Sequence, residues 1–63
     1  MASAAKFGYF IDKAGDWRWH LKAPNGKIIA DSGEGYTTRQ DCIRGAELVK
    51  LYAPDAEIVP DRA

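Results

Sequence analysis

The segment Trp17–Lys22, which reads WRWHLK, decides the fold of this chain because its apolar and charged residues alternate strictly. Side chains of a β-strand point alternately to its two faces, so one face of this segment is apolar and the other is charged. The apolar face carries Trp17, Trp19 and Leu21, and the charged face carries Arg18, His20 and Lys22. The pattern predicts a strand of an antiparallel sheet with one side buried and one side in water.

Two further strands are predicted, one before and one after this central strand. Lys6–Asp12 has an alternating pattern, and a polar loop that contains a glycine separates it from the central strand. After the central strand, Pro24–Gly26 favours a tight hairpin turn, in which Asn25 and Gly26 supply positive-φ positions. The β-branched residues that follow predict a third strand over Lys27–Asp31. We therefore expect three antiparallel strands in meander order.

A helix is predicted after the third strand. The sequence TTRQ at Thr37–Gln40 fits a capping box, in which the side chains of Thr37 and Gln40 satisfy free backbone amides. The helix should cover Thr38–Tyr52 and stop before Pro54, which cannot continue it. One face of this helix has small and apolar residues at helical spacing and is expected to pack on the sheet: Cys42, Ala46, Val49 and Ala53.

Some apolar residues have no place in this single packed layer. Leu48 and Leu51 lie away from the predicted core face of the helix. The segment Glu57–Val59 is a short strand signal at the end of the chain, and no nearby strand is an obvious partner for its Ile58 and Val59. The terminal strand is expected to gain order only by pairing with a strand edge, which may belong to the same chain or to a partner, and Leu48 and Leu51 are expected to need cover.

The chain is short and has no covalent or metal cross-link. A chain below roughly 70–80 residues seldom gains more than about 3–5 kcal/mol from one core. The 63 residues include one cysteine and one histidine, which exclude an intrachain disulfide and a protein-only zinc site, and no cofactor is expected.

Residues 1–5 are expected to be a tail and residues 6–60 a single domain. We expect a homodimer, with a marginally stable monomer as the alternative. Its predicted interface contains Leu48, Leu51, Ile58 and Val59.

Charge and hydropathy restrict the partners of the chain. Nine basic and nine acidic side chains give a net charge of zero, which disfavours a dedicated binder of nucleic acid or of anionic membranes. No apolar run approaches the roughly 20 residues that cross a bilayer. The N-terminal sequence MASAA has no features of a signal peptide. We expect a cytoplasmic protein in a reducing compartment, without a membrane partner.

Three segments follow one another in an order that points to a family. They read DKAGDWRW, LKAPNGKIIA and SGEGY, and a helix with Cys42, Gly45 and Val49 comes next. With these segments, the stretch from Lys6 to about Asp55 resembles the YegP-like family of small bacterial and archaeal domains. The resemblance implies a β-β-β-α-β unit that occurs singly or in tandem, with two units sharing one sheet and exchanging C-terminal strands. For a single unit it implies a homodimer with the C-terminal strand exchanged, and it implies no reaction.

The charged face of the central strand is a candidate binding surface. Arg18, His20 and Lys22 form a cationic row there, and Phe10 of the preceding strand adds an aromatic ring. Proteins bind single-stranded nucleic acids and phosphorylated ligands with such combinations of charge and stacking. The alternative is an ordinary solvated sheet face, which the zero net charge favours.

Two other features suggest chemistry less strongly. Cys42 is a candidate nucleophile with His20 as its base, but its position on the apolar helix face favours a buried core residue. The segment Gly33–Gly35 precedes a helix, as phosphate-binding loops do, but it lacks a Walker lysine, so a tight connection is the better interpretation. The predicted fold class is α+β, a dimeric β-β-β-α-β unit with helices on one face of a continuous antiparallel sheet. The leading functional hypothesis is a homodimeric, non-catalytic interaction module. Binding of a ligand or of single-stranded nucleic acid on the open sheet face is the alternative, and an enzyme based on Cys42 comes third.

Overall fold

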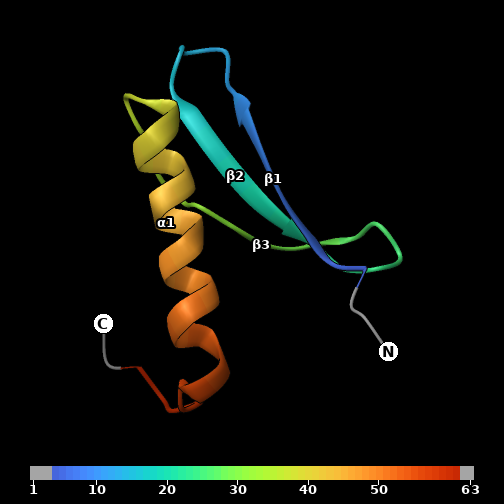
Figure 1. The fold of residues 1–63 in the computed structure, drawn as a ribbon. Coiled ribbons are helices and arrows are strands. Elements are labelled where there is room, and N and C mark those ends of the chain that lie inside the picture. Colours follow the sequence, from blue (N-terminus) through green and yellow to red (C-terminus); the bar gives the residue numbers. More distant parts are fainter. Residues whose placement is uncertain (1–3, 62–63) are drawn as a thin grey trace.

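The computed structural model describes residues 4–61, which form a three-stranded antiparallel sheet covered on one face by a helix (Figure 1). The sheet order is β1-β2-β3, so the predicted α+β class and the meander of three strands are confirmed. The elements in chain order are β1 (Lys6–Ile11), β2 (Trp17–Lys22), β3 (Ile28–Asp31), α1 (Arg39–Tyr52) and the 3-10 turn η1 (Ala53–Asp55).

The register between β1 and β2 separates an inner and an outer face of the sheet. Phe7 pairs with Leu21, and Tyr9 pairs with Trp19. These side chains share the face toward α1, because residues directly opposite each other in a ladder point to the same side. Ile11 and its partner Trp17 lie on the same face, and the alternate residues of both strands point away from the helix. The alternation predicted for β2 is therefore the alternation between core and solvent.

Both hairpin loops place a glycine in the left-handed region, at Gly15 (φ 88°) and Gly26 (φ 89°). In the second loop the N–H of Ala23 donates to the carbonyl of Lys27 at 2.8 Å. Asn25 does not have a positive φ, so the prediction that it shares this conformation with Gly26 was wrong. Because the loop is longer than a two-residue turn, one left-handed residue is enough to reverse the chain.

The helix begins at Arg39, one residue later than predicted, and its cap is Thr38 rather than Thr37. Thr38 is extended (φ −127°, ψ 151°), and its hydroxyl accepts a hydrogen bond from the N–H of Asp41 at 3.1 Å. The predicted capping box was therefore wrong by one residue. The extended residue just before the first turn is the one whose side chain reaches the free amides. The helix ends at Tyr52, as predicted.

The core is centred on Trp19 of β2, which is 5% exposed and packs against Cys42 and Ala46 of α1. Phe7 contacts the Trp19 ring edge-on, with 5.3 Å between centroids and 74° between ring planes. The predicted core face of the helix is confirmed except at Ala53, which begins η1 and is exposed. The partly buried hydrophobic residues around this cluster are Phe7, Trp17, Tyr36 and Val49.

The connection from β3 to α1 runs back along β2 and brings Tyr36 against the helix. The N–H of Tyr36 donates to the carbonyl of Trp17 and the N–H of Trp17 donates to the carbonyl of Tyr36, each at 2.8 Å. The phenol of Tyr36 lies over Gly45, where an added Cβ would collide with its hydroxyl and lie 2.9 Å from its Cζ. Glycine costs about 1 kcal/mol of helix propensity relative to alanine, but here it permits the close approach of the ring.

We predict that Gly45→Ala destabilises the protein, although alanine is the better helix former. The new methyl group must displace the Tyr36 ring, and overpacking of this kind costs about 1–3 kcal/mol. Urea unfolding at fixed protein concentration measures the change. In a Tyr36→Ala background the same substitution should be neutral or stabilising, because the obstacle is gone. Equal destabilisation in both backgrounds would contradict this explanation.

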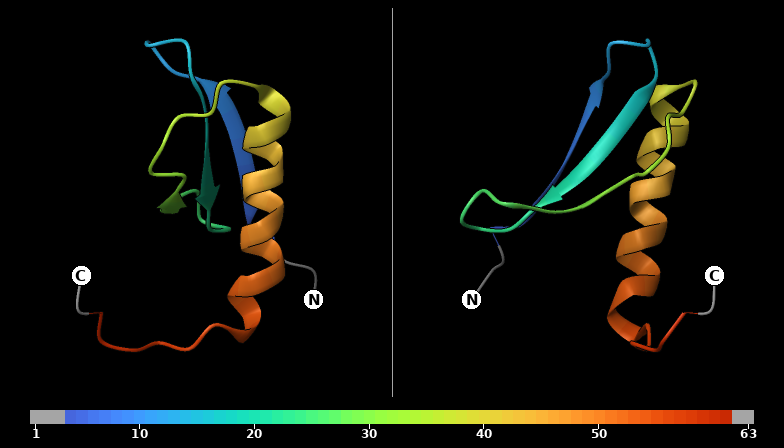
Figure 2. Two further views of the ribbon diagram at one scale, coloured as in Figure 1. Left: turned by 90° about the vertical axis from the view of Figure 1, so that its left-hand side faces the viewer. Right: turned by 180° about the vertical axis from the view of Figure 1, so that it is seen from behind.

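Beyond η1 the chain is irregular and pairs with no strand among the described residues (Figure 2). The fourth strand predicted at Glu57–Val59 is therefore absent from the single chain. The reason is geometric: the segment leaves the C-terminal end of α1, away from the sheet, so no strand edge lies within its reach.

Of the predicted tail, residues 1–3 lie outside the described residues. Within residues 4–61, no helix combines the length and apolarity needed to cross a bilayer.

Candidate functional site

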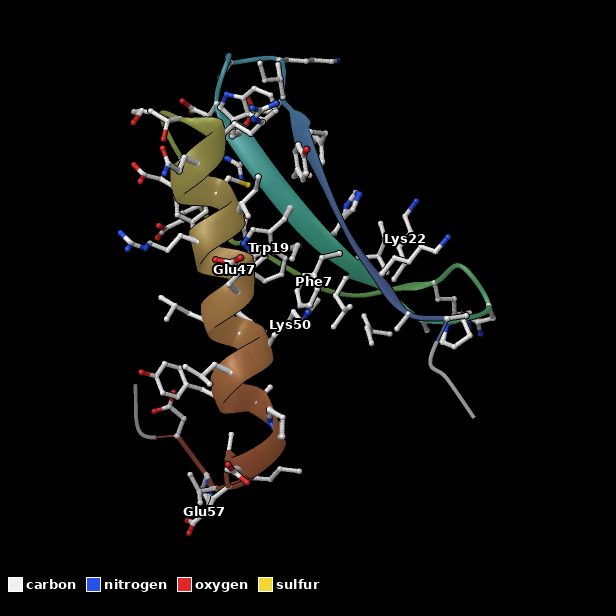
Figure 3. The ribbon with its side chains drawn as sticks, in the orientation of Figure 1. Phe7, Trp19, Lys22, Glu47, Lys50 and Glu57 are labelled. Atoms are coloured by element: carbon white, nitrogen blue, oxygen red, sulfur yellow. The ribbon has the colours of Figure 1, made fainter. Side chains whose placement is uncertain are left out.

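An apolar groove with a volume of about 640 Å³ lies between β1 and α1. It exists because the helix and the sheet diverge toward the C-terminal end of α1 (Figures 1 and 2). Figure 3 shows Phe7 and Trp19 projecting toward the helix, with Lys50 reaching from the helix toward Phe7. Apolar side chains form most of its lining, including Phe7, Trp19, Leu21 and Cys42. Charged residues contribute at Lys6, Glu47 and Lys50.

The residues predicted to lie in a dimer interface are all exposed in the single chain. Leu48 and Leu51 on α1 are 46% and 64% exposed, and Ile58 and Val59 are 102% and 62% exposed. Large apolar side chains this open to water mark a surface that another molecule covers when they form a contiguous patch. Leu48 also contributes to a shallow apolar hollow beside Tyr52 at the C-terminal end of the helix.

The outer face of the sheet brings together Phe10, His20 and Lys22, as predicted, and adds Lys6. The rings of Phe10 and His20 are 4.7 Å apart between centroids and tilted by 33°. Lys6 is the direct cross-strand partner of Lys22. Sequence reasoning passed over Lys6, although the alternation of the first strand places it on the same face as Phe10.

Arg18 also lies on the outer face, but an ion pair holds it. Its Nε donates to Oδ2 of Asp12 at 2.5 Å. The other carboxylate oxygen of Asp12 accepts hydrogen bonds from the N–H groups of Ala14 (2.9 Å) and Asp16 (3.0 Å), which closes the β1–β2 loop. The hydrogen bond from Arg18, together with those from the backbone, keeps the pKa of Asp12 below its ordinary value of 3.8. Arg18 thus fixes the hairpin, and its charge is largely neutralised.

We predict that the Asp12–Arg18 pair makes the hairpin sensitive to acid. Because the pKa of Asp12 is lower in the folded protein, the pair stabilises the fold above the pKa of the unfolded carboxyl. That contribution is lost as the pH falls through the lower folded pKa. Asp12→Asn keeps an oxygen that accepts from the loop amides but has no charge to titrate. As the pH falls through this range, its Tm should therefore decrease less than the Tm of the wild type. Asp12→Ala loses both functions and should have the lowest Tm of the three proteins at neutral pH. Identical acid dependence of wild type and Asp12→Asn would refute the assignment.

Cys42 and His20 lie on opposite sides of the sheet, so the structure does not bring the candidate nucleophile and base together. Cys42 is fully buried beneath the helix, next to Trp19, whereas His20 points to the outer face. Burial raises the pKa of the Cys42 thiol, which reduces its thiolate population at neutral pH. Among the residues the structure describes, no three His, Cys, Asp or Glu side chains gather to hold a metal ion.

We predict that Cys42 reacts with a thiol reagent only when the protein opens. Labelling of the folded protein at neutral pH should be slow, and urea should accelerate it to the rate of a free thiol, because the folded chain shields the sulfur. Absorbance of the released thiolate from an aromatic disulfide reagent measures the rate. Rapid labelling of the folded protein would restore Cys42 as a candidate nucleophile.

The loop at Gly33–Gly35 is a tight connection. The N–H of Gly33 donates to the side chain of Asp31 at 3.0 Å, and Ser32 Oγ donates to the carbonyl of Glu34 at 2.8 Å. At Gly35, an added Cβ would lie 2.6 Å from Cβ of Asp16, so the loop packs directly on the first hairpin. Its polar groups are used to shape the connection, which supports the structural interpretation over a phosphate cradle.

Comparison with known proteins places these features in a family. The family model described as "Domain of unknown function (DUF1508)" matches residues 12–59. A UPF0339 protein of Methanosarcina acetivorans is 44% identical over 87% of this chain and 93% of its own length. A UPF0339 protein of Treponema denticola is 45% identical over 89% of this chain and 95% of its own length.

Two further similarities concern the fold and the length of relatives. The NMR solution structure of a protein from Haloferax volcanii has a TM-score of 0.88 at 45% identity, covering 95% of this chain and all of that one. A UPF0339 protein in the ptx operon 5′ region of Stutzerimonas stutzeri is 49% identical over 49 residues, which are 78% of this chain. Those 49 residues are only 43% of that relative, which is therefore more than twice as long as the matched segment.

Proposed function

The chain belongs to the DUF1508 family, which confirms its resemblance to the YegP-like proteins, and on this premise we propose that it acts as a homodimeric, non-catalytic interaction module. In this proposal the segment Glu57–Val59 of each copy becomes the fourth strand of the other copy. It pairs with the outer edge of β1, beside the apolar groove. The completed unit is then β-β-β-α-β, and it works in the cytoplasm.

The main support for this proposal is the groove, which leaves the core of a single chain incomplete. Only Trp19, Cys42 and Ala46 are buried hydrophobic residues among those described, while Phe7 and Leu21 line an open groove. A core this small stabilises a fold weakly, and covering the groove with apolar atoms would remove further hydrocarbon from water at roughly 25 cal/mol per Å². A second copy offers such atoms on the one residue of Ile58 and Val59 that faces the groove in the added strand, since neighbouring strand residues point to opposite faces.

The free sheet edge gives a second reason. In the order β1-β2-β3, β1 has β2 on one side and no strand on the other among the described residues. An edge strand presents unpaired N–H and C=O groups that can template another strand. Glu57–Val59 forms no strand in the single chain and carries two adjacent β-branched residues, which suit a strand.

The long Stutzerimonas relative is consistent with the same assembly. Its length leaves room for a second unit of similar size beside the matched 49 residues. Two such units linked in one chain could each cover the groove of the other, as two separate copies would. The contacts are the same in both cases, because each unit exchanges the same C-terminal segment. The burial of Cys42 away from His20 supports the non-catalytic part of the proposal.

Sedimentation velocity over a range of concentrations tests the exchanged-segment dimer. The wild-type chain should sediment as a dimer, and Ile58→Glu combined with Val59→Glu should sediment as a monomer. Neighbouring strand residues point to opposite faces, so one of the two new charges would have to enter the apolar groove at a large desolvation cost.

The matched control is Ile28→Glu combined with Ile29→Glu, which makes the same change at exposed residues of β3, on the opposite edge of the sheet. This control should remain a dimer. A monomeric wild-type protein would refute the dimer itself. A dimer that survives the changes at Ile58 and Val59 would refute the exchange of the C-terminal segment.

A further inference from the structure

We propose that the outer face of the sheet binds single-stranded nucleic acid, with a base stacked on the Phe10–His20 ring pair and phosphates held by Lys6 and Lys22. The ring pair and Lys22 lie on the face opposite to the groove and to α1, whereas Lys6, on the edge strand β1, also borders the groove. Figure 3 shows Lys22 at the end of β2, directed away from the helix.

The ring pair has the exposure and the surroundings of a stacking platform. Phe10 is 36% exposed on the solvent side of the sheet, where an apolar ring serves no core, and its ring lies against the imidazole of His20. The direct partner of His20 across the ladder is Gly8. A Cβ at Gly8 would meet nothing within 4 Å, so the surface beside the rings is open to an incoming base. Stacking on aromatic rings of a sheet is a common way of holding unpaired bases.

The charges next to the platform fit the phosphates of such a strand. Lys6 and Lys22 are direct cross-strand partners, which places their Cβ atoms about 5 Å apart. Like charges directly opposite each other destabilise a sheet, and an anion between them removes the repulsion. Within residues 4–61, neither lysine forms an ion pair, whereas Arg18 is held by Asp12. The one carboxylate directly opposite a platform residue is Asp31 of β3, which pairs with His20. Lys6 lies on β1, which does not pair with β3.

A local site of this kind is compatible with zero net charge. Long-range attraction is absent, so we expect modest affinity at low salt and little binding at high salt. The combination of rings and two lysines favours an unpaired strand over a duplex, because a duplex offers phosphates but keeps its bases stacked inside.

Fluorescence anisotropy with a labelled twelve-nucleotide thymidine strand tests the site in the full-length protein. Wild type should bind at low salt, and Phe10→Ala should weaken binding about tenfold through the lost stacking. Lys22→Glu should abolish most of the binding. It also places opposite charges across the ladder from Lys6, so it should not lower stability. Lys22→Ala should reduce the salt dependence by about 0.7 in the logarithmic slope, as expected for one lost phosphate contact.

Arg44→Glu is the matched control, because it makes the same charge reversal on an exposed residue of α1. It should leave the affinity unchanged. Three results would each overturn the proposal. The first is no binding at low salt, and the second is an equal loss of affinity in Arg44→Glu and Lys22→Glu. The third is equal affinity for the single strand and for a duplex of the same length. Sedimentation of Lys22→Glu should match that of the wild type, so that failure of this site and failure of the dimer are separate results.

Discussion

The packing of Trp19 between the sheet and α1 is the interaction on which the rest of this small structure depends. The indole is large enough to touch Phe7 on the neighbouring strand and Cys42 and Ala46 on the helix, and it joins the two layers. The small residues at the contact let the helix come close. Where the helix runs past this contact, it diverges from the sheet, and the groove opens. The core and the groove therefore have one cause, which is that the large side chain of Trp19 packs against the small side chains of Cys42 and Ala46.

The local structure followed closely from the sequence wherever a local rule determines it. Strict alternation in WRWHLK located β2 to the residue, and the spacing of Cys42, Ala46 and Val49 identified the helix face. Errors occurred where two neighbouring residues of the same kind compete. Thr37 and Thr38 have the same chemistry, and only the backbone conformation decides which one caps the helix. Asn25 likewise suits a left-handed position, but the length of the loop decides that Gly26 alone adopts it.

The candidate surfaces were harder to predict because they depend on register between strands. Alternation placed Arg18, His20 and Lys22 in one row, but only the structure pairs Arg18 with Asp12 and sets Lys6 opposite Lys22. The groove could not be predicted at all, because it depends on the angle between a helix and a sheet, and no local pattern encodes that angle. The terminal Ile58 and Val59 were recognised as unpartnered from the sequence, and they remain so in the single chain.

The attachment of α1 at one end has a mechanical consequence. The Tyr36–Trp17 bridge, the Thr38 cap and the contact of Tyr36 with Gly45 all lie in the first half of the helix or before it. The core contacts of the helix end at Val49, and the last turn of α1 extends past them. The width of the groove is therefore set by the angle at which these contacts hold α1 against the sheet.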